Sequence, residues 1–199
     1  MQIKSVCVYC GSSPGLMPEY RDAAISVGRL LAQEGITLVY GGGNVGLMGA
    51  MADSALAHGG RVIGVIPHAL VAMEVAHRGV SELLAVGDMH ERKKKMADLA
   101  DAFVALPGGI GTLEEIFEAM TWTQLCIHDK PCGFLNTCGY YDALFQFMRH
   151  MTEQRFFKKE HLESLIIESD ENLLLSRLKS HVPTRSEKWI DRGGPKTGL

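Results

Sequence analysis

The chain lacks the features that mark membrane, secreted or nucleic-acid-coating proteins. Its 199 residues contain no apolar run of about 18 residues and no signal-peptide core, so we expect neither a membrane partner nor secretion. Charge is nearly balanced, with 20 Lys+Arg against 23 Asp+Glu, and the dense basic run Arg92–Lys95 is too short to coat a nucleic acid. These absences predict a cytoplasmic protein that binds no nucleic acid.

Cysteine usage does not indicate a disulfide framework. The chain has 5 cysteines, an odd number, and they are scattered along its length. Free thiols in a reducing compartment are the simplest account. Cys7 and Cys10 form a C-x-x-C pair, but no second pair accompanies them and they fall in an apolar, strand-like segment. We therefore expect no metal site and no redox cofactor.

The common nucleotide-binding signatures are also incomplete. No G-x-x-x-x-G-K-[ST] segment is present, which leaves a nucleoside triphosphate P-loop unsupported. Gly41, Gly43 and Gly46 do match G-x-G-x-x-G. However, the next apolar segment ends at Val65–His68 without the Asp or Glu that a dinucleotide site uses for its ribose. A phosphate remains expected, and a second nucleotide half does not.

Short continuous apolar segments alternate with helix-like segments along the chain. The expected strands are Lys4–Cys10, Ile36–Tyr40, Arg61–Ile66, Glu82–Val86, Ala102–Leu106, Cys132–Leu135 and Leu165–Glu168. The expected helices are Pro18–Glu34, Val45–His58, Met89–Leu99, Thr112–Ile127, Tyr140–Gln154 and Glu171–His181. Strands that are apolar on both sides are typical of a parallel sheet covered by helices on both faces.

The predicted fold class is therefore α/β, a doubly wound, mostly parallel, Rossmann-like sheet. We expect a single nucleotide-monophosphate-binding domain over residues 1–182 and a polar C-terminal tail over residues 183–199. A loop of about fourteen residues is expected after Pro67, because no helical or strand period is evident there.

Two glycine-rich loops follow predicted strands at the point where each should lead into a helix. They are Gly41–Gly46 and Pro107–Thr112, and Gly11–Ser13 follows the first strand in the same way. Glycines admit a ligand close to the backbone, and a helix N-terminus favours an anion. Since the carboxyl ends of parallel strands share one edge, the loops predict a phosphorylated small molecule at that edge.

The second loop has the pattern P-G-G-x-G-T-x-x-E. Thr112 and Glu115 have capping-box spacing, which by itself only starts a helix. A cap does not explain the small and rigid residues before it, so we favour a functional role for Glu115, which is compatible with capping. Asp88 and Glu91 form a second candidate capping box. Arg92 then lies near a helix start, where a cation gains nothing from the dipole, and is expected to face an anion or a carboxylate.

Together these residues resemble the Lonely Guy family of nucleoside 5′-monophosphate phosphoribohydrolases. The resemblance rests on Gly41–Gly43, the Met-His-x-Arg-Lys segment Met89–Lys93 and the P-G-G-x-G-T-x-x-E motif, and it extends from about Val6 to about Gln154. Members have often been labelled lysine decarboxylases, but no pattern in the chain indicates pyridoxal-phosphate chemistry.

The resemblance implies hydrolysis of the N-glycosidic bond of an N6-modified adenosine 5′-monophosphate, without a metal or organic cofactor. By position, Arg92 and Glu115 correspond to the catalytic pair. The expected substrate contacts are Glu74, Lys93, Gly108, Gly109, Ile110, Gly111, Thr112, Leu113, Glu114 and Thr121, to which the glycine loops add Ser12, Gly42 and Gly43.

The residues suit this chemistry, and two other functions stay open. Glu115 can stabilise positive charge on the ribose or activate water, while Arg92 carries a guanidinium, a poor proton donor, and is expected to orient groups rather than to give a proton. The alternatives are an AMP nucleosidase without N6 preference and a non-catalytic carrier of the same fold. The helix expected over Thr112–Ile127 has apolar residues on most sides, which favours a homodimer, as the family resemblance also implies.

Overall fold

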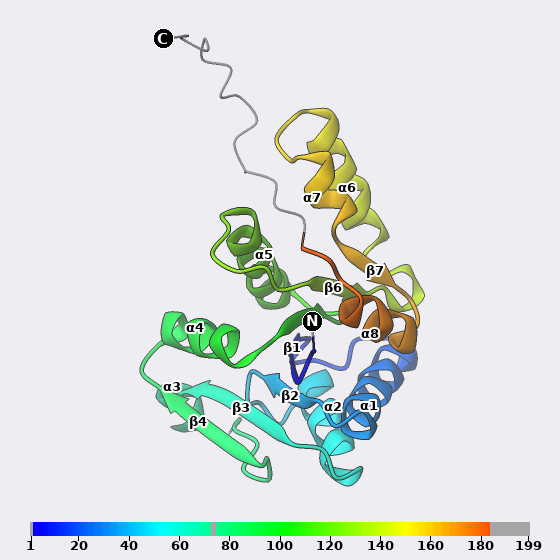
Figure 1. Cartoon of the computed structure of the whole chain (residues 1–199). Coiled ribbons are helices and arrows are strands. Elements are labelled where there is room, and N and C mark those ends of the chain that lie inside the picture. The colour runs from blue at the N-terminus through cyan, green and yellow to red at the C-terminus, as the bar shows by residue number, and fades with distance from the viewer. Residues whose placement is uncertain (1, 73–74, 184–199) are drawn as a thin grey trace.

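A computed structural model describes residues 2–72 and 75–183, and seven strands of this part of the chain form one parallel sheet (Figure 1). The strands are β1 (Ser5–Tyr9), β2 (Thr37–Tyr40), β3 (Val62–Pro67), β4 (Glu82–Val86), β5 (Ala102–Ala105), β6 (Cys132–Leu135) and β7 (Ile166–Glu168). All six pairings are parallel, in the order β4-β3-β2-β1-β5-β6-β7. The predicted doubly wound α/β class is confirmed.

Helices follow most of the strands. They are α1 (Pro18–Gln33), α2 (Gly46–Ala57), α3 (His68–Ala72), α4 (Met89–Leu99), α5 (Ile110–Gln124), α6 (Asp142–Glu153), α7 (Lys159–Glu163) and α8 (Glu171–Lys179), with a short 3-10 helix η1 (Thr137–Gly139). Among the described residues, no helix is both long and apolar enough to cross a lipid bilayer.

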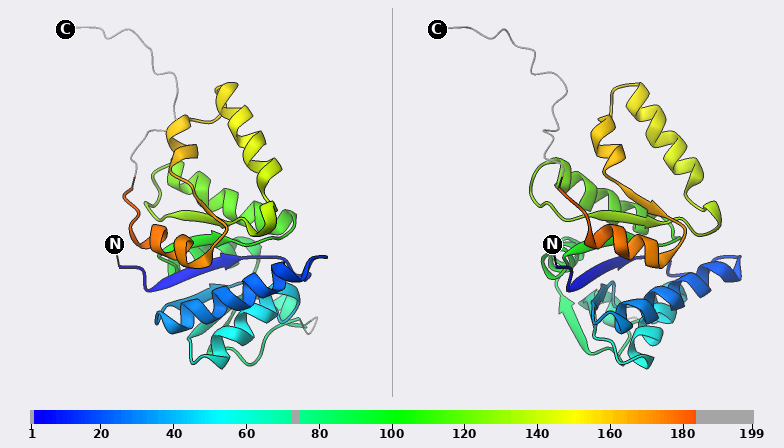
Figure 2. Two further views of the ribbon diagram at one scale, coloured as in Figure 1. Left: turned by 90° about the vertical axis from the view of Figure 1, so that its right-hand side faces the viewer. Right: turned by 45° about the vertical axis from the view of Figure 1, so that its right-hand side comes forward.

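The core forms two layers because every central strand is buried on both faces. In β1, Val6 and Val8 belong to one buried cluster, while Cys7 and Tyr9 belong to the other. Helices α1, α2 and α8 complete the first cluster, and α4, α5 and α6 complete the second. Figure 2 shows α1 and α2 on one side of the sheet, with α5 and α6 on the other. Burial on both faces explains why the strands are continuously apolar.

The strand order places a switch point at the centre of the sheet. From β1 the chain proceeds through β2, β3 and β4 on one side, then crosses over to β5, β6 and β7 on the other. The loops after β1 and β5 therefore lie side by side, and the Gly11 N–H donates to the Pro107 carbonyl at 3.0 Å. The loop after β2 joins them through the Leu47 N–H, which donates to the Gly11 carbonyl at 3.0 Å. Ligands of such sheets bind at this position.

Three local predictions differ from the structure. The expected loop after Pro67 contains helix α3, and Ala76 then pairs with Gly43 in an antiparallel bridge. Pro67 does not break the third strand but is its last residue, aligned with Val86 of β4. Helix α7 was not predicted, because five residues are too few to display a helical period. The predicted tail boundary lies next to residues 184–199, which are outside the described residues.

Helices α1 and α2 pack closely enough to require a glycine between them. A Cβ added to Gly28 would lie 2.2 Å from the Met51 carbonyl oxygen, so the α2 backbone would have to move. We predict that Gly28→Ala lowers the free energy of unfolding by roughly 1–3 kcal/mol, measured by urea denaturation. Gln33→Ala, on an exposed part of α1, should change it by less than about 0.5 kcal/mol. A Gly28→Ala variant as stable as the parent would contradict this packing.

Candidate active site

An almost fully buried ion pair joins α4 to α5 near the switch point. Arg92 Nη1 lies 3.1 Å from Glu115 Oε1, and the two side chains are only 12% and 11% exposed. The Arg92 Nε–H also donates to the Val65 carbonyl, at 3.1 Å. The prediction that Arg92 faces an anion or a carboxylate is confirmed, and the partner is the glutamate of the P-G-G-x-G-T-x-x-E motif.

The local sequence at the start of α4 determines where the Arg92 side chain leaves the helix. Asp88 caps α4 by accepting the Glu91 N–H at 2.8 Å, and Glu91 accepts the Gly87 N–H at 2.7 Å. The predicted cap at Asp88 is therefore present, with Glu91 bonding one residue earlier than an ideal capping box. Arg92 follows in the first turn and points over the end of β2. A Cβ on Gly41 would lie 2.0 Å from Arg92 Nη2, so only glycine leaves room for the guanidinium.

Burial gives Glu115 unusual acid–base properties. Desolvation is the largest influence and raises the pKa of Glu115 above its ordinary value. The positive charges of Arg92 and Lys93 act in the opposite direction, while the negative charges of Glu114 and Glu118 add to the increase. A carboxylate of raised pKa is a better proton acceptor than an exposed one, which suits it to activate water.

The start of α5 is open to a ligand. The helix begins at Ile110 with Gly109 as its N-cap, two residues before the predicted start at Thr112. Thr112 and Glu115 therefore form no capping box, and Glu115 lies in the second turn. The glycines let the helix begin earlier than a cap by Thr112 would. A Cβ added to Gly109 or to Gly111 would meet no atom within 4 Å. The space beside both glycines is therefore open on the Cβ side, and Gly109 makes no side-chain cap hydrogen bond. The first N–H groups of a helix have no intrahelical partner, as an anion site requires.

Two tyrosine hydroxyls bond to the backbone of the residues just before α5. The Tyr141 hydroxyl donates to the Leu106 carbonyl at 2.6 Å, and the Tyr140 hydroxyl donates to the Gly108 carbonyl at 2.7 Å. Thr112 is buried, and its Oγ1 would lie 2.2 Å from a Cβ on Gly108. The sequence analysis missed both tyrosines, because nothing local relates them to a loop some thirty residues earlier.

Other predicted contacts are already paired with protein groups. Lys93 Nζ forms ion pairs with Glu114 and, at 3.1 Å, with Glu118. The Thr121 hydroxyl donates to the Phe117 carbonyl at 2.7 Å, and Thr121 lies about 9 Å along the α5 axis from Glu115. Ile110, at the start of α5, is 82% exposed. Leu113, three residues further along the helix, is partly buried.

The glycines of the loop after β2 are buried within the protein. Gly42 and Gly43 are buried, the Gly42 carbonyl accepts the His77 N–H at 2.8 Å, and Gly42 has a φ of 73° that favours glycine. Ser12 is exposed beside this loop, and a Cβ on Gly46 would lie 2.3 Å from the Ser12 carbonyl carbon. Glu74, the remaining predicted contact, lies outside the described residues.

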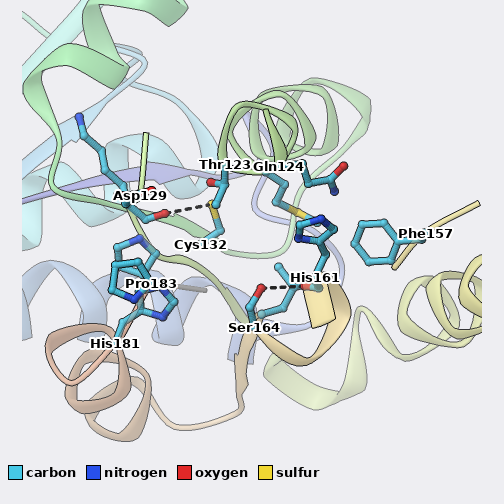
Figure 3. A pocket seen from close by; sticks show the side chains of 13 residues that line it. Thr123, Gln124, Asp129, Cys132, Phe157, His161, Ser164, His181 and Pro183 are labelled. Atoms are coloured by element: carbon cyan, nitrogen blue, oxygen red, sulfur yellow. Dashed lines mark hydrogen bonds between the residues drawn. The ribbon is translucent and has the colours of Figure 1, made fainter. Parts of the chain in front are cut away.

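A separate small pocket lies at the other edge of the sheet (Figure 3). It is formed where α5 ends and β6 begins, by residues that include Gln124, Cys132 and His161. None of the predicted site residues lines it. All five cysteines are free, and in the described ranges no three His, Cys, Asp or Glu side chains gather in a way that could hold a metal ion.

Comparison with known proteins agrees with these observations. Residues 48–178 match a family model described as "Possible lysine decarboxylase". The cytokinin riboside 5′-monophosphate phosphoribohydrolase LOG1 of Arabidopsis thaliana is 46% identical over 187 residues, which is 94% of this chain and 87% of that protein. The corresponding enzyme LOG of Oryza sativa subsp. japonica is 45% identical over 182 residues, 92% of this chain and 75% of that protein.

Solved structures share the fold at lower identity. A molybdenum cofactor binding protein from Rippkaea orientalis matches with a TM-score of 0.69 and 23% identity, covering 90% of this chain and 98% of that one. The molybdenum cofactor carrier protein of Chlamydomonas reinhardtii matches with a TM-score of 0.67 and 19% identity, over 90% and 98% of the two chains. At these identities the likeness shows the fold alone.

Substitution of Gly41 tests whether the position of Arg92 matters, because it removes neither charge of the ion pair. Because an added methyl group overlaps Arg92 Nη2, we expect Gly41→Ala to displace the guanidinium. Turnover of cytokinin riboside 5′-monophosphate, the substrate in the relatives' names, should then fall by roughly 10²-fold. The control is Gly59→Ala after α2, where an added Cβ meets no atom within 4 Å but φ is 76°. It should cost about 1–3 kcal/mol of stability and leave turnover unchanged. Normal turnover by Gly41→Ala would show that the position of Arg92 is unimportant.

Proposed function

The chain belongs to the family of cytokinin riboside 5′-monophosphate phosphoribohydrolases, and on that premise we propose that it hydrolyses the N-glycosidic bond of an N6-modified adenosine 5′-monophosphate. The products are the free cytokinin-type base and ribose 5-phosphate. The observation that carries the proposal is the buried Arg92–Glu115 pair next to the open N-terminus of α5.

Glu115 acts at the sugar. Breaking the bond between C1′ and the base builds positive charge on the ribose, which a nearby carboxylate stabilises. Glu115 accepts a proton from water as the water oxygen bonds to C1′. The electron pair of the broken bond leaves with the base, which takes a proton from solvent. A raised pKa supports this role, because it increases the affinity of Glu115 for the proton of water.

Arg92 orients Glu115 and does not transfer protons. A guanidinium is a poor proton donor, because its positive charge is delocalised over the whole group. Its Nη1 contact fixes the Glu115 carboxylate, while its Nε–H is occupied by the Val65 carbonyl. Arg92 is therefore anchored to the sheet, and Glu115 is anchored to Arg92. This arrangement supports a fixed carboxylate position relative to C1′.

The phosphate binds at the start of α5, away from the broken bond. There it supplies binding energy that positions the sugar. The proposed contacts are Gly108, Gly109, Ile110, Gly111, Thr112 and Leu113 around the phosphate, with Ser12, Gly42 and Gly43 in the neighbouring loops and Glu74, Lys93, Glu114 and Thr121 for the rest of the nucleotide. No metal or organic cofactor is needed for this chemistry.

The proposal extends to assembly and compartment. A homodimer is supported by apolar residues that remain exposed near the end of α5, with Leu125 44% and Ile127 63% exposed. The partly buried Trp122 and Phe117 lie on the same helix. Free cysteines support action in a reducing compartment such as the cytoplasm.

Release of free base tests the function directly. We predict that the purified protein, incubated with AMP and with N6-isopentenyl-AMP, releases base from the modified nucleotide with the higher kcat/KM, as followed by chromatography. Equal kcat/KM values would indicate a general AMP nucleosidase. If neither nucleotide yields free base, the protein is not an N-glycosidase, and a carrier role is favoured.

Substitution of Glu115 tests its assigned role. Glu115→Gln keeps the size of the side chain and removes the base, so kcat should fall by at least about 10²-fold. Phosphate binding, measured with ribose 5-phosphate by calorimetry, should remain. Glu153→Gln, at a 72% exposed position on α6, should leave both quantities unchanged. Near-normal turnover by Glu115→Gln would remove the carboxylate from the mechanism.

A further inference from the structure

Lys93 is a buried lysine held between two carboxylates. Its side chain is 9% exposed, and its Nζ contacts both Glu114 and Glu118. Arg92, the preceding residue, pairs with Glu115. Two consecutive cations of α4 therefore meet three carboxylates of α5. A buried ammonium stays charged only where carboxylates compensate it, so these contacts are needed for Lys93 to carry its charge.

The two partners of Lys93 differ in exposure and place. The Glu114 side chain is 50% exposed and lies nearer to the open start of α5, where the nucleotide is proposed to bind. The Glu118 side chain is 29% exposed and lies one helical turn further along α5. A substrate that engages Glu114 competes with Lys93 for that carboxylate. Glu118 lies further from the proposed nucleotide site, so it can stay paired with Lys93 when the nucleotide binds.

We propose that Glu118 is a positioning residue of this reaction. Its ion pair with Lys93 holds α4 against α5, so that Arg92 keeps its contact with Glu115 while Glu114 engages the nucleotide. This inference rests on the proposed function for the reaction and on the described contacts for the geometry. Glu118 lies outside the P-G-G-x-G-T-x-x-E motif, three residues beyond its glutamate.

The charged groups around Glu115 determine in which direction each substitution should shift the pKa of Glu115. Arg92 and Lys93 face it from α4, and Glu114 and Glu118 from α5. From β1 it is faced by groups whose own pKa values are raised by burial, namely Cys7, Tyr9 and Cys10. Glu118 raises the pKa of Glu115, whereas Lys93 lowers it. Removing the Glu118 charge should therefore lower this pKa, and removing the Lys93 charge should raise it.

The experiment compares Glu118→Gln with Lys93→Met. Glu115 must be ionised to accept a proton, so the acid limb of kcat/KM follows its pKa. Glu118→Gln should reduce kcat about tenfold, less than the roughly 10²-fold expected for a misplacement of 1 Å, and should move the acid limb to lower pH. Lys93→Met should move the limb to higher pH. Glu118→Asp retains the charge on a shorter side chain, so kcat should fall less and the limb should stay.

The matched control removes an ion pair far from the site. Glu34, just after α1, pairs with Lys179 of α8 at 2.6 Å. Glu34→Gln should therefore change neither kcat nor the acid limb. If Glu118→Gln does not fold, Glu118→Asp carries the test alone, with lowered kcat against the control as the expected result.

A second measurement does not depend on turnover. In protein with 13C-labelled glutamate carboxyls, NMR titration reports the pKa of Glu115 in each variant. Opposite shifts in Glu118→Gln and Lys93→Met show that both charges act on Glu115, whether or not the parent protein releases base. If the parent releases no base, the proposed function fails and the catalytic role of Glu118 fails with it. A parent that releases base while Glu118→Gln keeps the parental kcat, acid limb and Glu115 titration would overturn the role and leave the function standing.

Discussion

The contact between Arg92 and Glu115 is the constraint on which the site depends. Two charged groups that are 12% and 11% exposed have lost most of their hydration, and such a pair is stable only when its geometry is fixed on both sides. The Val65 carbonyl fixes the guanidinium from the sheet. Gly41 supplies the space that the guanidinium occupies. The sheet edge, the glycine loop and the capped helix α4 thus serve one ion pair.

The fold brings this pair to the place where a nucleotide can reach it. The crossover from β4 to β5 sets the loops after β1 and β5 side by side, and the Gly11–Pro107 hydrogen bond ties them together. Helix α5 then starts at the same edge with free N–H groups and carries Glu115 in its second turn. One helix therefore carries both the proposed anion site, at its start, and a carboxylate. In the proposed complex the phosphate lies at the first of these and the sugar at the second.

Sequence reasoning predicted the features that depend on local pattern. Continuous apolar segments such as Ala102–Leu106 predict a parallel sheet. The capping-box spacing of Asp88 and Glu91 predicts the start of α4. The expectation that Arg92 faces an anion or a carboxylate also followed from its unfavourable place near a helix start, and Glu115 is that carboxylate. These inferences succeeded because the cause and the residue are close in sequence.

The missed features have causes that are distant in sequence. Glycine at 109 lets α5 begin two residues before the predicted helix start at Thr112. Tyr140 and Tyr141 reach the carbonyls of Gly108 and Leu106 only after β6 has been placed beside β5. Glu118 could have been found, since it lies one turn from Glu114 on the same helix face. Its ion pair with Lys93 depends on how α4 packs against α5, which the local sequence does not show.

The most direct test of this account is a crystal structure of the protein with AMP bound. The account predicts the phosphate at the start of α5 among Gly108–Thr112, and a Glu115 carboxylate oxygen within about 3–3.5 Å of the attacking water or of C1′. A phosphate bound on another surface, or a Glu115 side chain turned away from the sugar, would contradict it.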